Sequence, residues 1–262
     1  MRSELVVISW WSNCLGLTCL HNLVEHAPGR TIYVVQVGKS AAQQARFRER
    51  LPAPVRELPY PADAPAEHGK VLERVVRDLL PEHEGVWFLD HDWFVLEPFE
   101  PWLLNMDRTL APSDCCLCHS HAAAGPALTC PAFWLSPARL PDGLPGFEPV
   151  PYQPSEVWRR PDRFRAPADL RMPDKDTLAL AQEFLAAQDL VREYALASLP
   201  RYRHLAGLYL FAYEILPDPF RDWMAECVAR FTAFFAACPA DWLGAEDPVL
   251  LERLAEFREA VL

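Results

Sequence analysis

The chain has 262 residues, of which 51% are hydrophobic and 23% are charged, and these values are typical of a soluble globular protein with one large domain. Its net charge of −11 argues against a broad nucleic-acid-binding face, because such a face needs clustered basic residues. No apolar run approaches the ~20 residues of a membrane span and residues 1–13 are not typical of a signal peptide, so a cytoplasmic protein without a membrane span is expected.

Residues 1–90 alternate between short apolar runs and amphipathic segments. Continuous apolar runs with β-branched residues predict four strands, over residues 5–9, 31–37, 55–60 and 86–90. Helical periodicity predicts three helices between them, over residues 16–27, 40–51 and 68–80. This alternation predicts an α/β fold with a mainly parallel central sheet flanked by helices. In such sheets ligands bind at the carboxyl ends of the strands.

The pattern changes after residue 98. Short strands are predicted over 115–121 and 131–136, a helix over 176–190, and a strand or turn over 203–211. Ten prolines between residues 131 and 173 predict a long loop of the kind that forms lids or binding sites. Aromatic stripes at helical spacing predict a C-terminal helical hairpin, over 218–238 and 246–262, which packs on the sheet or forms a dimer interface. We therefore expect one domain over residues 1–215 and the hairpin over 216–262.

The fourth predicted strand ends on Asp90-His91-Asp92. Residues i and i+2 of a strand lie on the same face, so the two carboxylates can converge on one cation. Mg²⁺ and Mn²⁺ prefer oxygen ligands and commonly take one or two carboxylates together with substrate phosphates. The plainer interpretation is a strand end that reaches solvent.

Other segments place this motif in a familiar order. The stretch "HGKVLERVVRDLLPEHEGVWFLDHDWFVLEPF" resembles the central segment of bacterial GT-A-type glycosyltransferases, in which a His-Gly precedes a helix and the next strand ends in Asp-x-Asp. "LVVISWWSNCLGLTCLHNL" resembles the first strand, nucleotide-contacting turn and first helix of that family, and "LTCPAFWLSPARL", "PDKDTLALAQEFL" and "RYRHLAGLY" resemble later segments. The resemblance implies a GT-A-like nucleotide-sugar-binding domain over residues 1–215, with residues 131–173 as the acceptor or lid region.

The resemblance also implies an activity. A sugar would move from a nucleotide-diphosphate donor to a hydroxyl acceptor, with a Mn²⁺ or Mg²⁺ ion as cofactor. Asp90 would contact the nucleotide ribose or the metal, Asp92 would bind the metal, and His204 would be a third metal ligand or a diphosphate contact. The implied nucleotide pocket is lined by Ser9 and Asn13, with His68, Gly69 and Lys70 nearby. Asp176 or Asp174 would be the catalytic base of an inverting reaction. The chain departs from the family pattern at His91 and at Ala206.

Two alternatives to a glycosyltransferase stay open from the sequence. A nucleotidyltransferase could use a similar sheet, but the turn "SWWSNCLG" contains no basic residue to form a phosphate-binding loop. A non-catalytic GT-A-like domain could use the C-terminal helices for partner binding or homodimerisation.

Two further clusters invite a functional interpretation. Cys115 and Cys118 have zinc-site spacing and His119 and His121 could complete four ligands, but buried small side chains explain these cysteines equally well. Most of the eight cysteines are expected to be reduced. The basic stretch 159–165, with Arg171, could bind a diphosphate or an anionic acceptor, or could be a solvated loop.

Overall fold

The computed structural model describes residues 2–10, 12–61, 64, 68–121, 125–127, 132–147, 179–205, 229 and 231–243. The strands in this part of the chain are β1 (Glu4–Trp10), β2 (Ile32–Val37), β3 (Val55–Leu58), β4 (Val86–Asp90), β5 (Trp93–Val95), β6 (Cys116–His121), β7 (Gly125–Ala127), β8 (Ala132–Leu135), β9 (Val191–Ala195) and β10 (Tyr202–His204). The helices are α1 (Asn13–His26), α2 (Ala41–Arg48), α3 (His68–Arg74), α4 (Glu100–Thr109) and α5 (Ala179–Ala186), with the π-helical turn η1 (Val75–Leu79) and the short 3-10 turns η2 (Pro137–Arg139) and η4 (Leu196–Ser198).

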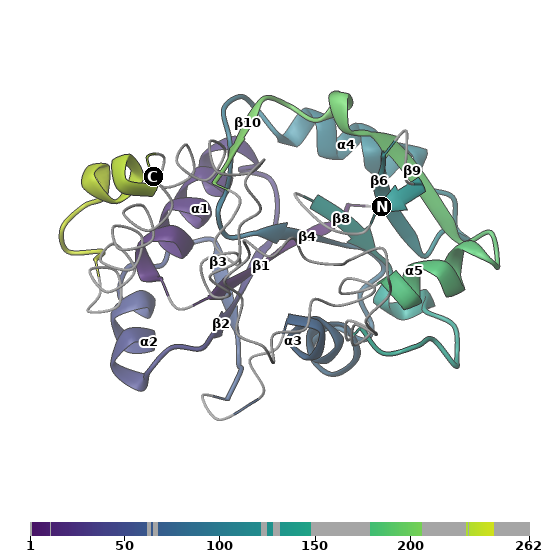
Figure 1. Ribbon diagram of the computed structural model, residues 1–262, viewed down its shortest axis with the longest axis horizontal. Helices are drawn as coiled ribbons and strands as arrows, with labels where there is room; N and C mark the ends of the chain where they lie inside the picture. The colour runs from purple at the N-terminus through teal and green to yellow at the C-terminus, as the bar shows by residue number, and fades with distance from the viewer. Residues whose placement is uncertain are drawn as a thin grey trace, which may run out of the picture.

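The central sheet has the strand order β3-β2-β1-β4-β8-β6-β7, and β9 also pairs with β6 (Figure 1). Strands β1 to β4 are all parallel, so the α/β class with a mainly parallel sheet is confirmed on this side. Strand β8 instead runs antiparallel to both of its neighbours, β4 and β6. A separate two-stranded sheet pairs β5 with β10.

Helices cover both faces of the sheet. Alternate residues of β1 point to opposite faces, as strand geometry requires. Leu5 and Val7 face one core with α1, α2 and α4, whereas Val6 and Ile8 face a second core with α3, η1 and α5. Helices α1 and α2 lie together on one side of the strands and α3 lies across from them (Figure 1). Both α1 and α2 begin with a serine N-cap, Ser12 and Ser40.

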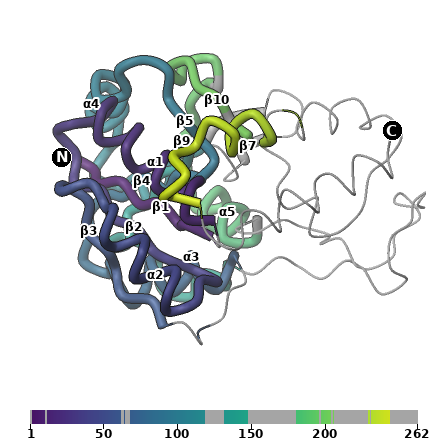
Figure 2. The backbone as a smooth tube through the Cα atoms, turned by 90° about the vertical axis from the view of Figure 1, so that its left-hand side faces the viewer, coloured from purple at the N-terminus to yellow at the C-terminus, as the bar shows by residue number. Residues whose placement is uncertain are grey.

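The described part of the C-terminal region, residues 229 and 231–243, packs against the domain that precedes it (Figure 2). Phe231 and Phe235 are buried in the same core as α1. A disulfide joins Cys14 in the first turn of α1 to Cys238, across 224 residues of sequence. This part of the predicted hairpin therefore packs on the chain's own core, while its second helix lies outside the described residues and homodimerisation stays a prediction.

A buried ionic network lies at the amino-terminal end of β1. Nη1 of Arg30 donates to Oδ2 of Asp107 at 2.6 Å and to the carbonyl oxygen of Ser3 at 2.7 Å. Nε of Arg30 donates to both carboxylate oxygens of Glu100 at 3.2 Å. The Ser3 hydroxyl donates to Asp107 and accepts from the indole of Trp134. The side chains of Arg30 and Asp107 are 0% and 2% exposed, so this is a fully buried ion pair with further hydrogen bonds.

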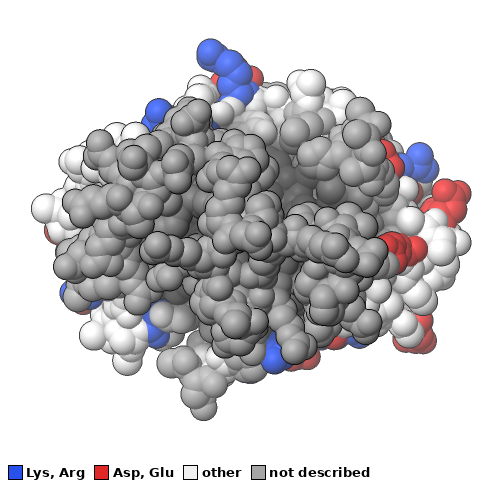
Figure 3. Space-filling model, in the orientation of Figure 1, with Lys and Arg blue, Asp and Glu red and all other residues white. Residues whose placement is uncertain are grey.

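The surface carries charges of both signs. In Figure 3, described Lys and Arg side chains lie at several places around the rim of the face, and Asp and Glu side chains gather on the right of the view. Among the described residues, no helix combines the length and apolarity that crossing a bilayer would require. The cytoplasmic location stays a prediction.

Candidate functional site

The carboxyl ends of β1 and β4 meet at one edge of the sheet. The two strands are parallel neighbours, and Ile8 lies opposite Asp90 in their register. Asp90 is half-buried, while His91 and Asp92 are only 6% and 7% exposed. The two carboxylates therefore belong to a tight, largely buried connection between β4 and β5, and are not at a freely solvated strand end.

Hydrogen bonds from other elements fix the connection from Asp90 to Trp93. The backbone N–H of Trp10, at the end of β1, donates to Nδ1 of His91 at 3.1 Å. The backbone N–H of Leu205 donates to the carbonyl oxygen of Asp92 at 3.0 Å. The middle residue of the motif, which departs from the family pattern, thus links the ends of β1 and β4.

Cys19, on α1, contacts the backbone of the same connection. Its thiol lies 3.6 Å from the carbonyl oxygens of both Asp90 and Trp93. Burial raises the pKa of this thiol well above its usual value, and the negative charges of Asp92 and Asp90 raise it further. The sulfur therefore keeps its proton, which it can donate to the two carbonyl groups.

Asn22, one turn further along α1, clamps strand β5. Its side-chain N–H donates to the carbonyl oxygen of Val95 at 2.9 Å, and its side-chain oxygen accepts from the N–H of Val95 at 2.8 Å. Val95 is fully buried, so both backbone groups depend on this one side chain on that side of β5. Helix α1 therefore holds the connection at Cys19 and the strand after it at Asn22.

We expect Asn22→Ala to lower the free energy of unfolding by about 1 to 3 kcal/mol, because two buried backbone groups of Val95 lose their partner. Denaturant unfolding measures this change. Asn105→Ala is the matched control, since Asn105 is exposed on α4 and a surface change of this kind costs about 0.5 kcal/mol or less. Equal losses in the two variants would show that the clamp does not stabilise the fold.

A small pocket opens beside the connection. It is lined by Ile8, Trp10, His68, Leu72, Phe88, Leu89, Asp90 and Phe133. The rings of Trp10 and His68 meet edge to face with centroids 5.7 Å apart, and the rings of Phe88 and Phe133 stack at 5.0 Å. The volume of the pocket is about 20 Å³, which is room for about one water molecule, so it forms a small aromatic hollow with a carboxylate at its edge.

Some of the residues predicted to contact the nucleotide lie at this pocket, and others do not. The structure brings His68 and Asp90 to this pocket, with Gly69 buried next to His68. Lys70 instead lines a second pocket on another face of α3. Ser9 is fully buried, and its hydroxyl lies so close to α1 that a Cβ on Gly16 would be 2.0 Å from it. Ser9 therefore serves the contact between β1 and α1.

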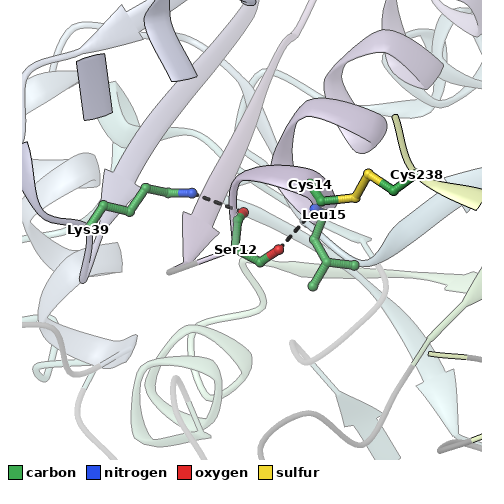
Figure 4. Close-up of a disulfide and its surroundings, with 5 residues drawn as sticks. All are labelled: Ser12, Cys14, Leu15, Lys39 and Cys238. Atoms are coloured by element: carbon green, nitrogen blue, oxygen red, sulfur yellow. Dashed lines mark hydrogen bonds between the residues drawn. A yellow bond between two sulfur atoms is a disulfide. The ribbon is translucent and has the colours of Figure 1, made fainter. Parts of the chain in front are cut away.

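Asn13 is also committed within the protein. Its side-chain N–H donates to the carbonyl oxygen of Gln43, and its side-chain oxygen accepts from Nζ of Lys39 at 3.0 Å. Lys39 also donates to the carbonyl oxygen of Ser12 at 3.0 Å, as Figure 4 shows, and its ammonium lies 4.6 Å from the ring centre of Phe47. The first turn therefore does have a buried basic residue, which reaches it from the end of β2.

The donor set at the connection fits a hard divalent cation. Asp90 and Asp92 supply carboxylate oxygens, which Mg²⁺ and Mn²⁺ prefer. The backbone of His204 lies opposite Trp93 in the β5–β10 pairing, and Trp93 directly follows Asp92; its role as a third ligand stays a prediction. Among the described side chains no group of three His, Cys, Asp or Glu residues could hold a metal by itself. Two carboxylates completed by ligand phosphates match the usual Mg²⁺ arrangement. Asp174 and Asp176 lie outside the described residues.

Comparison with known proteins gives structural matches alone. No protein-family model matches the chain, and no curated protein matches it in sequence. The mannosyltransferase PcManGT from Pyrobaculum calidifontis, solved with GDP-Man and Mn²⁺, is similar over 99% of this chain and 74% of its own, with 14% identity and a TM-score of 0.46. A protein of Desulfovibrio desulfuricans G20 assigned as a nucleotide-diphospho-sugar transferase is similar over 74% of this chain and 80% of its own, with 9% identity and a TM-score of 0.43.

The galactosyltransferase LgtC, solved with donor and acceptor sugar analogs, has 11% identity and a TM-score of 0.41 over 52% of this chain. The match spans 58% of the length of that galactosyltransferase. The function proposed below rests on the residues of this chain.

The cysteine cluster on β6 is a packed core element. Cys115, Cys116 and Cys118 are buried in the core that faces α3 and α5. Burial raises the pKa of the Cys115 thiol and raises that of Cys116 well above its usual value, so both thiols keep their protons. The thiol of Cys118 lies 3.7 Å from the carbonyl oxygen of Arg192. These contacts favour the interpretation as buried small side chains; the side chains of His119 and His121 lie outside the described part.

Proposed function

We propose that this protein is a metal-dependent glycosyltransferase that moves a sugar from a nucleotide-diphosphate donor to a hydroxyl acceptor. The observation that carries the proposal is the connection from Asp90 to Trp93, which presents two carboxylates at the joined carboxyl ends of β1 and β4. Three elements hold this connection through contacts from Trp10, Cys19 and Leu205. Such pre-organisation is expected of a charged binding site and is unnecessary at a solvated strand end.

Each residue then has a role. Asp92 and Asp90 would hold a Mn²⁺ or Mg²⁺ ion, with His204 as a third ligand, and the bound ion would supply positive charge next to the departing diphosphate. Trp10 and His68 would contact the nucleotide through the pocket next to Asp90. Asp174 or Asp176 would accept the proton of the acceptor hydroxyl if the reaction inverts the sugar configuration.

Thermal unfolding with a panel of nucleoside diphosphates and nucleotide sugars, each with and without Mn²⁺, tests the proposal. A ligand at 100 times its Kd stabilises the folded state by about 2.7 kcal/mol, which raises Tm by about 5 to 10 °C for a chain of this size. We expect such a rise with one nucleoside diphosphate in the presence of Mn²⁺, and its loss in Asp92→Asn. The base that gives the rise identifies the donor.

The control is Asp142→Asn, which removes an exposed carboxylate from a turn remote in sequence from the motif. This variant should keep the full rise. A wild-type protein that no nucleotide stabilises, with or without Mn²⁺, would contradict the proposal. An Asp92→Asn protein that is unfolded without ligand would show that the carboxylate is structural.

A nucleotidyltransferase is the second candidate, and Lys39 is the observation that favours it. Sequence alone gave the first turn no basic residue, whereas the folded turn has the ammonium of Lys39 against Ser12 and Asn13. The same panel separates the two functions. A nucleotidyltransferase would be stabilised more by a nucleoside triphosphate than by the matching nucleotide sugar.

A further inference from the structure

A second pocket lies on the outer side of α3. Its lining residues are Tyr60, Lys70, Glu73, Arg74, Arg77 and Asp78, and its volume is about 370 Å³. None of these residues lines the pocket next to Asp90. Three of the six are basic, in a protein whose net charge is −11. The volume of this pocket is within the range of small-ligand sites, and its lining of charged side chains suits a charged ligand.

Arg74 is the central group of this pocket. Its guanidinium carbon lies 5.2 Å from the ring centre of Tyr60, which is itself 8% exposed. Nε of Arg74 is buried, and within the described part of the chain Arg74 has no hydrogen-bond partner at Nε and no ion pair. A cation–π contact of this kind attracts the guanidinium to the ring without using its N–H donors. Leaving a buried charged donor without a partner is costly, so this guanidinium has hydrogen-bonding capacity that the described part of the chain does not use.

The nearby acidic residues do not neutralise Arg74. Glu73 pairs with Arg77 at 2.9 Å, and Arg77 also donates to the carbonyl oxygen of Leu144 at 3.0 Å. Asp78 is four residues beyond Arg74, which in an α-helix would place it on the same face. The π-helical turn η1 begins at Val75 and shifts this register, and no ion pair joins Arg74 to Asp78. Such turns occur frequently at functional sites.

We propose that this pocket is a binding site for the anionic group of a small ligand, a phosphate or a carboxylate. The guanidinium of Arg74 donates to two oxygens of the anion, in the bidentate geometry that arginine forms with both groups. Lys70, one helical turn earlier on α3, adds positive charge on the same side of the pocket. The site is separate from the carboxylates of the proposed metal site, and its occupant does not depend on the nucleotide.

Inorganic phosphate and acetate are the two probes, and both are titrated at constant ionic strength maintained with chloride. We expect one of them to raise the Tm of the wild-type protein along a saturating curve. Phosphate also stabilises folded proteins without binding to a site, and that contribution rises with concentration and does not saturate. The saturating part should disappear in Arg74→Gln. Saturation by phosphate identifies a phosphate ligand, and saturation by acetate alone identifies a carboxylate.

Three variants complete the test. Arg108→Gln removes an exposed arginine in the last turn of α4 and should keep the saturating curve. Asp92→Asn should also keep it, so that a failure of the proposed transferase function leaves this result intact. Arg74→Lys keeps the positive charge but loses the planar guanidinium that donates to two oxygens at once, so it should weaken anion binding at least tenfold. This variant tests the proposal in a folded protein even if Arg74→Gln does not fold. A saturating curve that is unchanged in Arg74→Lys, or the absence of saturation in the wild type, would overturn the proposal.

Discussion

Replacing Arg30 with methionine is expected to lower the free energy of unfolding by about 3 to 5 kcal/mol. Arg30 donates to Asp107, Glu100 and the backbone of Ser3, and its side chain is fully buried. Methionine fills much of the volume but leaves the carboxylate of Asp107 buried without its cation, and an uncompensated buried charge is the main source of the loss. Urea unfolding monitored by tryptophan fluorescence measures the change.

Two variants show whether burial is the cause. Arg2→Met removes an arginine that also pairs with Glu100 but is 56% exposed, and exposed pairs are worth about 0 to 1 kcal/mol. The double variant Arg30→Met with Asp107→Leu removes both buried charges and should be more stable than Arg30→Met alone. If Arg2→Met and Arg30→Met lowered the free energy of unfolding equally, the buried network would contribute no more to stability than an exposed ion pair.

The second large effect concerns the disulfide between Cys14 and Cys238. Cross-linking two residues that are 224 positions apart restricts the unfolded chain strongly, and loop-closure entropy gives a stabilisation of about 5 kcal/mol. We expect Cys238→Ser to lose this amount, and reduction of the wild-type protein to lose a similar amount. Peptide mapping by mass spectrometry without reductant should recover the linked peptide that contains both residues.

The control compares how the wild type and Cys238→Ser respond to a reductant. Cys238→Ser should unfold at the same urea concentration with and without dithiothreitol, whereas the wild type should shift. A wild-type protein that does not respond to reductant and yields no linked peptide would contradict the pairing. Disulfides persist in oxidising compartments, so the same peptide map on protein from its native cells also tests the predicted cytoplasmic location.

The elements that the sequence predicts well are those with one dominant signal. Strands β1, β2 and β4 are continuous apolar runs, and α2 has both halves of a capping box at Ser40. Helix α4 was missed because Pro101 lies in its first turn and its apolar residues follow directly on those of β5. Strand β9 was missed because it contains two charged residues and is partly exposed. The antiparallel direction of β8 relative to β6 follows from the short span between them, since only ten residues separate the end of β6 from the start of β8 and a parallel crossover needs about a dozen or more.

For the candidate site, the position of Asp90 and Asp92 could be predicted, because strand ends are visible in a sequence. The groups that contact the backbone of this connection could not be predicted, because they come from segments that are distant in sequence. Cys19 lies 71 residues before the carbonyl group of Asp90 that it contacts, and nothing in its local sequence shows this. Lys39 did carry a signal, since it follows β2 at the edge of the sheet where ligands bind. Ser9 and Asn13 lie at that edge too, but they are used for packing and internal hydrogen bonds.

Helix α1 is attached to its surroundings at successive turns. The disulfide ties its first turn to Cys238, Gly16 lies directly against Ser9, and Asn22 holds β5. These attachments leave α1 few degrees of freedom relative to β1 and β5. The connection that carries Asp90 and Asp92 also contacts α1, through Cys19, so it belongs to this same attached unit.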